Sequence, residues 1–298
     1  MASNMRILMF DLLVERETFG HGGNQEVVRP FITRKNVELL LLTPQMQSLE
    51  SGEKTEKETQ VTLNEEDVPH WDDEYEFWES NDVDFDGHLA NFHRIVMPMH
   101  TNDEKMANWL NELNVDAIVC SGSRRNVSIW EEWMGPASSL LRVAALSGTP
   151  TLGICFGHQL LCHALGSEIE RADAMSSGLW DLKLTEEGEM DKLLTSHTNE
   201  EDTIVGVFSH QDHVTTIPEN CTLLSTASHN QVTAIRVNDK DGRKLPAWGI
   251  QFHPEAAKAR IKRAYEWGHI SEEEYTSLKG EHDGAEILAS FADIVLQK

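Results

Sequence analysis

The sequence predicts an α/β fold in which a mostly parallel, open sheet carries helices on both faces. Short apolar runs of strand length alternate with helical patterns along most of the chain, and this alternation is typical of parallel sheets. The chain has 298 residues, of which 40% are hydrophobic, so it is long enough to form one sizeable core. In such sheets the functional groups gather at the carboxyl ends of the strands.

The first part of the chain opens as a βαβ unit. Met5–Leu13 and Val37–Leu42 are apolar runs of strand length, and the polar stretch between them can hold a helix. The next predicted elements are a strand at 94–99, a helix at 103–113 and a strand at 115–120. The strand at 115–120 is predicted to be buried because it is rich in β-branched residues.

The same alternation continues to the end of the chain. A helix from Ser138 is predicted to stop at Gly148, because glycine is the usual residue just after a helix. The following elements are a strand at 152–155, a helix at 157–165, strands at 203–208, 222–227, 234–237 and 247–252, and helices at 256–267 and 284–296.

One acidic segment interrupts this pattern. From about 48 to 86 Asp and Glu dominate, and aromatic residues are interleaved in WDDEYEFWES, residues 71–80. We interpret this segment as an insertion in a single domain spanning residues 1–298. Such a segment is a solvated loop whose rings pack back on the domain, or else a lid or docking surface.

Composition excludes several classes of function. The formal net charge of −25 opposes binding to nucleic acid or to an anionic membrane, and reflects solubility or a salty cytoplasm. No run approaches the roughly 20 apolar residues of a membrane span, and the first residues do not resemble a secretory signal. Four cysteines are too few for a disulfide framework. We therefore expect a cytoplasmic protein with reduced thiols.

The most informative motif is TLGICFGHQLL at 151–161. An apolar strand ends at Cys155, between Gly153 and Gly157, and a helix follows at once. This strand-turn-helix elbow holds a nucleophile in a strained, exposed position. The helix N-terminus favours a thiolate, and the N–H of Phe156 can receive a developing oxyanion. We interpret the remaining cysteines as core residues; these are Cys120, Cys162 and Cys221.

A thiol nucleophile needs a base and a group that orients the base. The segment AWGIQFHPE at 247–255 supplies both, because His253 follows a buried strand and Glu255 can face its imidazole. Pro254 fixes the turn between them. Cys155, His253 and Glu255 are therefore the candidate catalytic residues.

Together these segments identify a family resemblance. GICFGHQ with a downstream QFHPE resembles the class I glutamine amidotransferase domain, whose triad is cysteine, histidine and glutamate. SHQDHV at 209–214 resembles the family's Ser-His-x-Asp-x-Val segment, and Ser121-Gly122-Ser123 lies where the family carries an oxyanion-hole loop. Many members have Gly-Gly-Pro there, so Ser123 departs from the pattern. The resemblance covers the chain from about 5 to 295, apart from the insertion.

The resemblance implies a flavodoxin-like fold and a set of roles. Cys155 attacks a γ-glutamyl carbonyl, His253 moves the proton and Glu255 orients His253. The oxyanion hole is formed by Phe156 with Gly122 or Ser123. Substrate binding is expected from Gln159, His210, Gln211 and Asp212. The family needs no cofactor and no metal for this reaction.

Other interpretations stay open at this point. A metal could be imagined among Cys155, His158, Cys162 and His163, but the two histidines spread around the helix rather than sharing one face. The expected partner is a small γ-glutamyl substrate. The ammonia could pass to a separate synthetase subunit, or the enzyme could act alone, as free-standing proteins resembling plant γ-glutamyl peptidases do. A catalytically silent binding domain is the alternative of another class.

Overall fold

The computed structural model describes residues 4–13, 17–47, 88, 90–195, 203–268 and 270–297. The strands in this part are β1 (Met5–Phe10), β2 (Val37–Leu42), β3 (Ala90–Ile95), β4 (Ala117–Cys120), β5 (Thr151–Ile154), β6 (Ile169–Leu184), β7 (Ile204–Val214), β8 (Cys221–Ala227), β9 (Asn230–Asn238) and β10 (Lys244–Ile250). The helices are α1 (Glu17–Ile32), α2 (Asp103–Leu113), α3 (Met134–Ser147), α4 (Phe156–Ala164), α5 (Glu186–Glu189), α6 (Lys258–Glu266), α7 (Glu272–Leu278) and α8 (Gly284–Leu296), with a 3-10 turn, η2 (Pro44–Met46).

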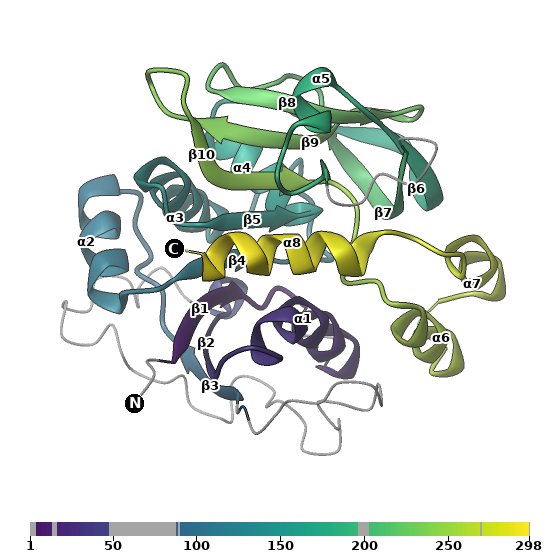
Figure 1. Cartoon of the computed structure of the whole chain (residues 1–298), viewed down its shortest axis with the longest axis horizontal. Helices are drawn as coiled ribbons and strands as arrows, with labels where there is room; N and C mark the ends of the chain where they lie inside the picture. Colours follow the sequence, from purple (N-terminus) through teal and green to yellow (C-terminus); the bar gives the residue numbers. More distant parts are fainter. Residues whose placement is uncertain are drawn as a thin grey trace.

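The strands form one sheet in the order β3-β2-β1-β4-β5-β10-β9-β8-β6-β7 (Figure 1). The six strands from β3 to β10 in this order pair in parallel. The pairs β10–β9, β9–β8, β8–β6 and β6–β7 are antiparallel. The prediction of an α/β fold with a largely parallel sheet is confirmed, and the antiparallel extension adds a feature that the sequence did not indicate.

Helices cover both faces of the parallel strands, as predicted. Alternate residues of a strand point to opposite faces, and β1 shows this directly. Its Ile7 and Met9 pack in one core with α1 and α8, whereas Leu8 and Phe10 pack in a second core with α2, α3 and α4. In Figure 1, α1 and α8 lie side by side in front of the parallel strands.

Several element boundaries differ from the predicted ones. The first strand ends at Phe10, and the third runs over 90–95 instead of 94–99. β6 was not predicted as a strand at all, and α7 was not predicted as a helix. β7 extends to Val214 rather than ending at 208, so the SHQDHV segment lies within a strand. The predicted helix stop is confirmed, because Gly148 caps α3 with a φ of 81°.

The acidic insertion predicted at about 48–86 lies outside the described residues. The single-domain boundary at 1–298 therefore stays a prediction. No helix in the described ranges is long and apolar enough to cross a membrane.

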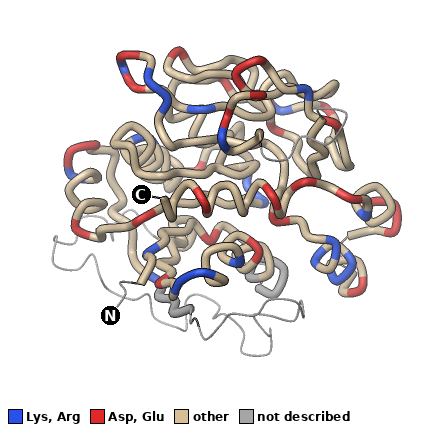
Figure 2. The backbone as a smooth tube through the Cα atoms, viewed as in Figure 1, with Lys and Arg blue, Asp and Glu red and all other residues tan. Residues whose placement is uncertain are grey.

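Acidic side chains are spread over the described surface rather than gathered at one place. Figure 2 shows clusters of them on α2 and on α7, which lie at opposite ends of the molecule in this view. The clusters correspond to Asp103 and Glu104 in the first turn of α2 and to Glu272, Glu273 and Glu274 in the first turn of α7. Carboxylates at these positions stabilise the helix N-termini.

Candidate active site

Three loops meet at the carboxyl ends of three neighbouring parallel strands. Ser121 follows β4, Cys155 follows β5 and Gln251 follows β10, and these strands are adjacent in the order β4-β5-β10. The register places Cys120 beside Gly153 and Ile154 beside Ile250. Because parallel strands end at the same edge, segments that are 130 residues apart in sequence converge there. This edge carries all of the predicted site residues except those of β7.

Cys155 lies on a strained turn between β5 and α4. Its φ of 50° and ψ of −101° are rare for a residue with a side chain. The turn is held on both sides, because the Cys155 N–H donates to Ile250 O at 2.8 Å and the Cys155 carbonyl accepts from the Gln159 N–H at 3.0 Å. Its side chain is 5% exposed. The elbow predicted from the glycine pattern is therefore present.

Gly157 allows α4 to lie directly against β4. A Cβ atom at this position would lie 2.1 Å from the carbonyl oxygen of Cys120, which is far inside van der Waals contact. The helix can therefore start immediately after Cys155 only because residue 157 has no side chain. The first N–H groups of α4 have no partner within the helix, and that of Phe156 belongs to this set.

His253 and Glu255 form a hydrogen-bonded pair behind the cysteine. His253 Nδ1 and Glu255 Oε1 are 2.8 Å apart, and the backbone N–H of His253 donates to Val207 O at 2.7 Å. Glu255 is only 4% exposed. Burial opposes the charged carboxylate, yet the pKa of Glu255 is lowered, because the His253 ring and the Arg260 guanidinium stabilise the anion.

The imidazole of His253 faces the sulfur of Cys155. Burial lowers the pKa of His253, but the thiolate charge of Cys155 and the carboxylate of Glu255 outweigh it, so the pKa lies well above the usual value. Among the described residues Nε2 has no hydrogen-bond partner of ordinary geometry. The contact with sulfur is therefore looser than a formed hydrogen bond, as is common for such pairs without substrate.

Gly122 brings the loop after β4 against both side chains. A Cβ atom on Gly122 would lie 3.0 Å from His253 Cε1 and 3.9 Å from Cys155 Cβ. Ser121 fixes this loop by donating its hydroxyl to Phe10 O at 2.7 Å, and the Ser123 hydroxyl accepts the Arg125 N–H at 3.1 Å. The predicted oxyanion-hole residues thus lie beside the cysteine, from two separate elements.

The predicted substrate residues form a connected network at β7. Gln159 Nε2 donates to Asp212 O at 2.6 Å and to Gln251 Oε1 at 3.1 Å, and Gln159 is 3% exposed. The Asp212 carboxylate accepts the N–H and the hydroxyl of Ser128, each at 2.8 Å. Gln159 is therefore not an ordinary amide of the helix surface. Gln251 and Ser128 are members of the network that the sequence did not indicate.

Gln211 and Arg171 form the outer part of the same network. Gln211 Oε1 accepts from Arg171 Nη2 at 2.6 Å, and Gln211 Nε2 donates to Ala172 O at 2.8 Å. Arg171 Nη1 also lies 3.6 Å from Asp212 Oδ1. β6 and β7 pair residue 171 with residue 212, and no sequence motif marks Arg171, because β6 was not predicted as a strand.

His210 has one free ring nitrogen beside the site. It is 5% exposed, its Nδ1 lies 2.9 Å from Asp212 O, and its Nε2 has no partner among the described residues. Burial lowers the pKa of His210 to about 4, and the nearby rings of His229 and His253 act in the same direction. The ring is therefore neutral over the physiological range and can accept or donate one further hydrogen bond.

This burial predicts a pH dependence of stability. The pKa of His210 is about 4 in the fold and near 6.5 in the unfolded chain, so the unfolded state binds the proton first. The contribution is complete above pH 6.5 and is lost as the pH falls toward 4. We expect the unfolding free energy to fall by about 2 to 3 kcal/mol from this residue between pH 7.5 and 4.5.

Urea unfolding of the native protein and of His210→Asn at both pH values measures this contribution. Asparagine can keep the contact to the Asp212 carbonyl but does not titrate, so its pH slope should be smaller. Equal slopes in the two proteins would show that His210 is not buried neutral. His158, with its pKa lowered to about 3 by burial, produces a part of the slope that both proteins share.

The other cysteines and histidines of the motif form no metal site. Cys120 and Cys162 are buried as predicted, whereas Cys221 is only partly buried. The ring of His158 is fully buried, 3.7 Å from the sulfur of Cys162. Within the described ranges no three side chains of His, Cys, Asp or Glu are placed to hold a metal ion.

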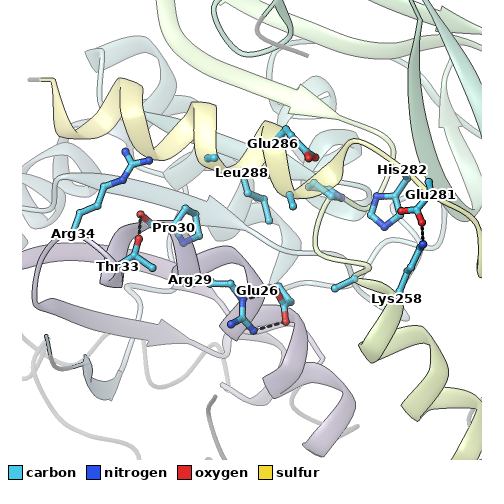
Figure 3. Close-up of a pocket in the computed structure, with 14 residues that line it drawn as sticks. Glu26, Arg29, Pro30, Thr33, Arg34, Lys258, Glu281, His282, Glu286 and Leu288 are labelled. Carbon is cyan, nitrogen blue, oxygen red and sulfur yellow. Dashed lines mark hydrogen bonds and ion pairs between the residues drawn. The ribbon is translucent and has the colours of Figure 1, made fainter. Parts of the chain in front are cut away.

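A separate groove lies on the other side of the His253–Glu255 segment. It has a volume of about 750 Å³ and runs between α1, α8 and the start of α6 (Figure 3). Its charged side chains are paired with one another: Arg29 with Glu26, and Lys258 with Glu281. Pro254 lines the groove, but Cys155 and His253 do not. This groove is therefore not the cleft of the candidate triad.

The elbow and the histidine segment lie within a stretch that matches a known protein family. The family model of class-I glutamine amidotransferases matches residues 88–266, which is more than half of the chain. This chain belongs to the class I glutamine amidotransferases. The resemblance seen in the GICFGHQ and QFHPE segments is thereby confirmed at the level of the family.

Similar proteins agree with this assignment. A subunit of glutamine-hydrolysing GMP synthase from Methanothermobacter thermautotrophicus is 36% identical over 112 residues, covering 37% of this chain and 54% of that protein. The same subunit from Methanocaldococcus jannaschii is 33% identical over 121 residues, covering 41% and 58%. This class I chain thus spans little more than half the length of these curated relatives.

A solved structure shows the same fold over nearly the whole amidotransferase chain. The crystal structure of a glutamine amidotransferase from Thermotoga maritima superposes with a TM-score of 0.57 at 16% identity, and covers 99% of this chain and 100% of that one. At this identity the likeness concerns the fold alone.

Proposed function

We propose that this protein hydrolyses the γ-glutamyl amide bond of glutamine or of a related γ-glutamyl compound. Cys155 is the nucleophile, His253 the acid and base, and Glu255 the residue that orients His253. The observation that carries the proposal is the arrangement of these three groups. A cysteine at positive φ on a strand-helix elbow faces an imidazole that is hydrogen-bonded to a buried carboxylate.

The reaction proceeds through two acyl transfers. Cys155 Sγ forms a bond to the γ-carbonyl carbon while its proton passes to His253, and the carbonyl oxygen becomes an oxyanion. The C–N bond then breaks as His253 protonates the leaving ammonia or amine. Water next loses a proton to His253 and attacks the thioester, and the S–C bond breaks to release glutamate and the thiol. No cofactor enters these steps.

Backbone donors stabilise the oxyanion in this proposal. The Phe156 N–H, at the first position of α4, adds the positive end of the helix dipole. The second donor is the N–H of Gly122 or of Ser123, because Gly122 lies within 4 Å of both Cys155 and His253 when a Cβ is placed on it. Preorganised donors of this kind contribute about 3 kcal/mol each to transition-state stabilisation.

We further propose that the β7 segment forms the wall that binds the glutamyl group. His210 contacts the substrate through its free Nε2. Gln159, Gln211 and Asp212 shape the wall indirectly, since their side chains are engaged with other protein groups. Substitution of these three should therefore raise KM more than it lowers kcat.

The relatives support a partnership with a synthetase. Both GMP synthase relatives are named as one subunit of that enzyme, so we propose that this chain supplies ammonia to a synthetase on a separate chain. The free-standing alternative, hydrolysis of γ-glutamyl peptides without a partner, rests on the similarity of GICFGHQ to both kinds of protein. A binding domain without activity is disfavoured by the complete triad.

Release of ammonia from glutamine, and of amines from a panel of γ-glutamyl dipeptides, tests the proposal. Slow, Cys155-dependent hydrolysis of glutamine supports a protein that awaits its synthetase, because such partners reorder the oxyanion loop. Fast cleavage of a dipeptide with little cleavage of glutamine supports the free-standing enzyme. A purified, folded protein that cleaves neither and forms no acyl adduct on Cys155 contradicts the proposed function.

A further inference from the structure

The carboxylate of Glu255 has less support than a buried charge requires. Its Oε1 accepts from His253 Nδ1 at 2.8 Å, but its Oε2 has no hydrogen-bond partner among the described residues. Glu255 is 4% exposed, so water cannot replace the missing partner. An ionised carboxylate in such a place needs a compensating charge.

Arg260 supplies this charge from the first turn of α6. Its Nη1 lies 3.8 Å from Glu255 Oε1 and donates to the backbone carbonyl of Glu255 at 3.3 Å. The side chain is 8% exposed, which is unusual for arginine. One guanidinium therefore contacts both the side chain and the main chain of Glu255.

Gly23 of α1 leaves the space that this guanidinium occupies. A Cβ atom on Gly23 would lie 2.8 Å from Arg260 Nη2 and 3.1 Å from Arg260 Cζ. A methyl group there would have to displace the end of the arginine side chain. No backbone atom of a neighbouring element stands within 4 Å among the three nearest contacts, so the displacement would fall on Arg260 itself.

α1 also lines the groove that borders this segment. Pro254, Ala257 and Lys258 share the groove wall with Glu26 and Arg29 of α1 (Figure 3). α1 thus flanks the catalytic segment through Gly23 and along the groove. The charged or titratable groups on the elements around Glu255 are His253 and Arg260, then Lys258 paired with Glu281, His282 bonded to Ala256 O, and the Glu26–Arg29 pair.

We propose that Arg260 is a positioning residue for the catalytic pair, which keeps Glu255 ionised and aimed at His253 from a slot that Gly23 leaves open in α1. This inference rests on the proposed function, because it assigns the support of the same triad. Arg260 touches neither Cys155 nor the reacting atoms in this proposal. It acts through Glu255 on the imidazole.

Three arginine variants test the role. Arg260→Met removes the charge, Arg260→Lys keeps it, and Arg263→Met removes a charge from the same helix away from Glu255. Loss of a cation at about 4 Å raises the pKa of a carboxylate by roughly one unit or more. We expect Arg260→Met to move the acid limb of kcat/KM upward by about one pH unit, with about a tenfold loss at pH 6 and little loss at pH 8.

Arg260→Lys should recover most of the activity at pH 6, and Arg263→Met should match the native protein at every pH. A merely structural role of Arg260 would lower kcat/KM equally across the pH range. It would also lower the urea midpoint in proportion. Either result, with an unshifted acid limb, overturns the inference.

Gly23→Ala gives an independent test from a different element. Alanine is the better helix former, so the urea midpoint should rise or stay unchanged. The displaced guanidinium should nevertheless lower kcat/KM about threefold at pH 6 and move the acid limb in the same direction as Arg260→Met. Activity equal to that of the native protein at pH 6 would contradict the proposed slot.

Alkylation of Cys155 by iodoacetamide, followed by mass spectrometry from pH 5 to 9, keeps the test independent of the substrate. The thiolate is the reactive form, and it depends on His253 and therefore on Glu255. Burial raises the pKa of Cys120 and Cys162 strongly, and that of Cys221 to about 12, so these thiols react slowly. If the native protein cleaves no γ-glutamyl substrate, the proposed function fails, but a shifted alkylation profile in Arg260→Met still supports the positioning role. Identical alkylation profiles in both proteins overturn it.

Discussion

Replacing Cys155 by alanine should lower kcat/KM for ammonia release from glutamine by about 10⁴-fold or more. The reason is that no other thiol can take its place: the remaining cysteines lie in the core or away from the edge where β4, β5 and β10 end. Because Cys155 is 5% exposed and small, alanine leaves only a minor cavity. The urea midpoint should therefore stay close to that of the native protein.

Two further variants separate the chemistry from the backbone strain. Cys155→Gly should be equally inactive, but it should unfold at a higher urea concentration than Cys155→Ala, because a φ of 50° with a ψ of −101° costs about 1 kcal/mol or more for a residue with a side chain. Cys221→Ala, at a partly buried cysteine far along the chain, should keep full activity. Measurable Cys155-independent release of ammonia would contradict the proposed mechanism.

The parts of the site that could be predicted from the sequence are those encoded locally. The elbow at Cys155 needs a strand, two small residues and a helix start within seven residues, and all of these stand together in LGICFGH. His253 and Glu255 are two residues apart, so one short segment carries the base and its orienting group. Alternating apolar runs likewise predicted the parallel strands, because each run forms its own element.

The parts that could not be predicted depend on pairings between distant segments. β6 is mostly exposed and alternates irregularly, with a register shift between Arg171 and Ser176, so neither hydrophobic period marks it as a strand. The role of SHQDHV follows from its place in the long strand opposite β6. A sequence pattern also cannot show which groups occupy the amide of Gln159, and this is why the structure ties Gln159 to Asp212 and Gln251 unexpectedly.

Arg260 illustrates the same limit. It stands in AKARIKRAY, where four basic residues read as the solvated face of a helix. Only the fold shows that one of the four turns inward to Glu255 while α1 supplies a glycine opposite it. The triad is thus encoded in two short motifs, but the charge that supports it comes from the packing of two helices that are far apart in sequence.

Gly157→Ala should destabilise the protein by about 3 kcal/mol or more. The added methyl group would meet the Cys120 carbonyl oxygen at 2.1 Å and the Cys120 carbonyl carbon at 2.8 Å. These are backbone atoms of β4, held between β1 and β5 in the centre of the sheet, and they cannot yield as a flexible side chain can. α4 must therefore move away from β4, and the elbow that holds Cys155 must move with it.

The same movement should lower kcat/KM by about 10²-fold, because the Phe156 N–H and the sulfur both shift from the position that suits attack. Gly135→Ala is the matched control. Gly135 also lies in the first turn of a helix, but its added Cβ would meet only Thr101 Cγ2 at 3.5 Å, an ordinary contact. That variant should unfold at the native urea concentration or slightly above it, and keep full activity. A Gly157→Ala protein with native stability would show that α4 does not press on β4 as closely as the structure has it, and the tight elbow would then no longer explain how Cys155 is held.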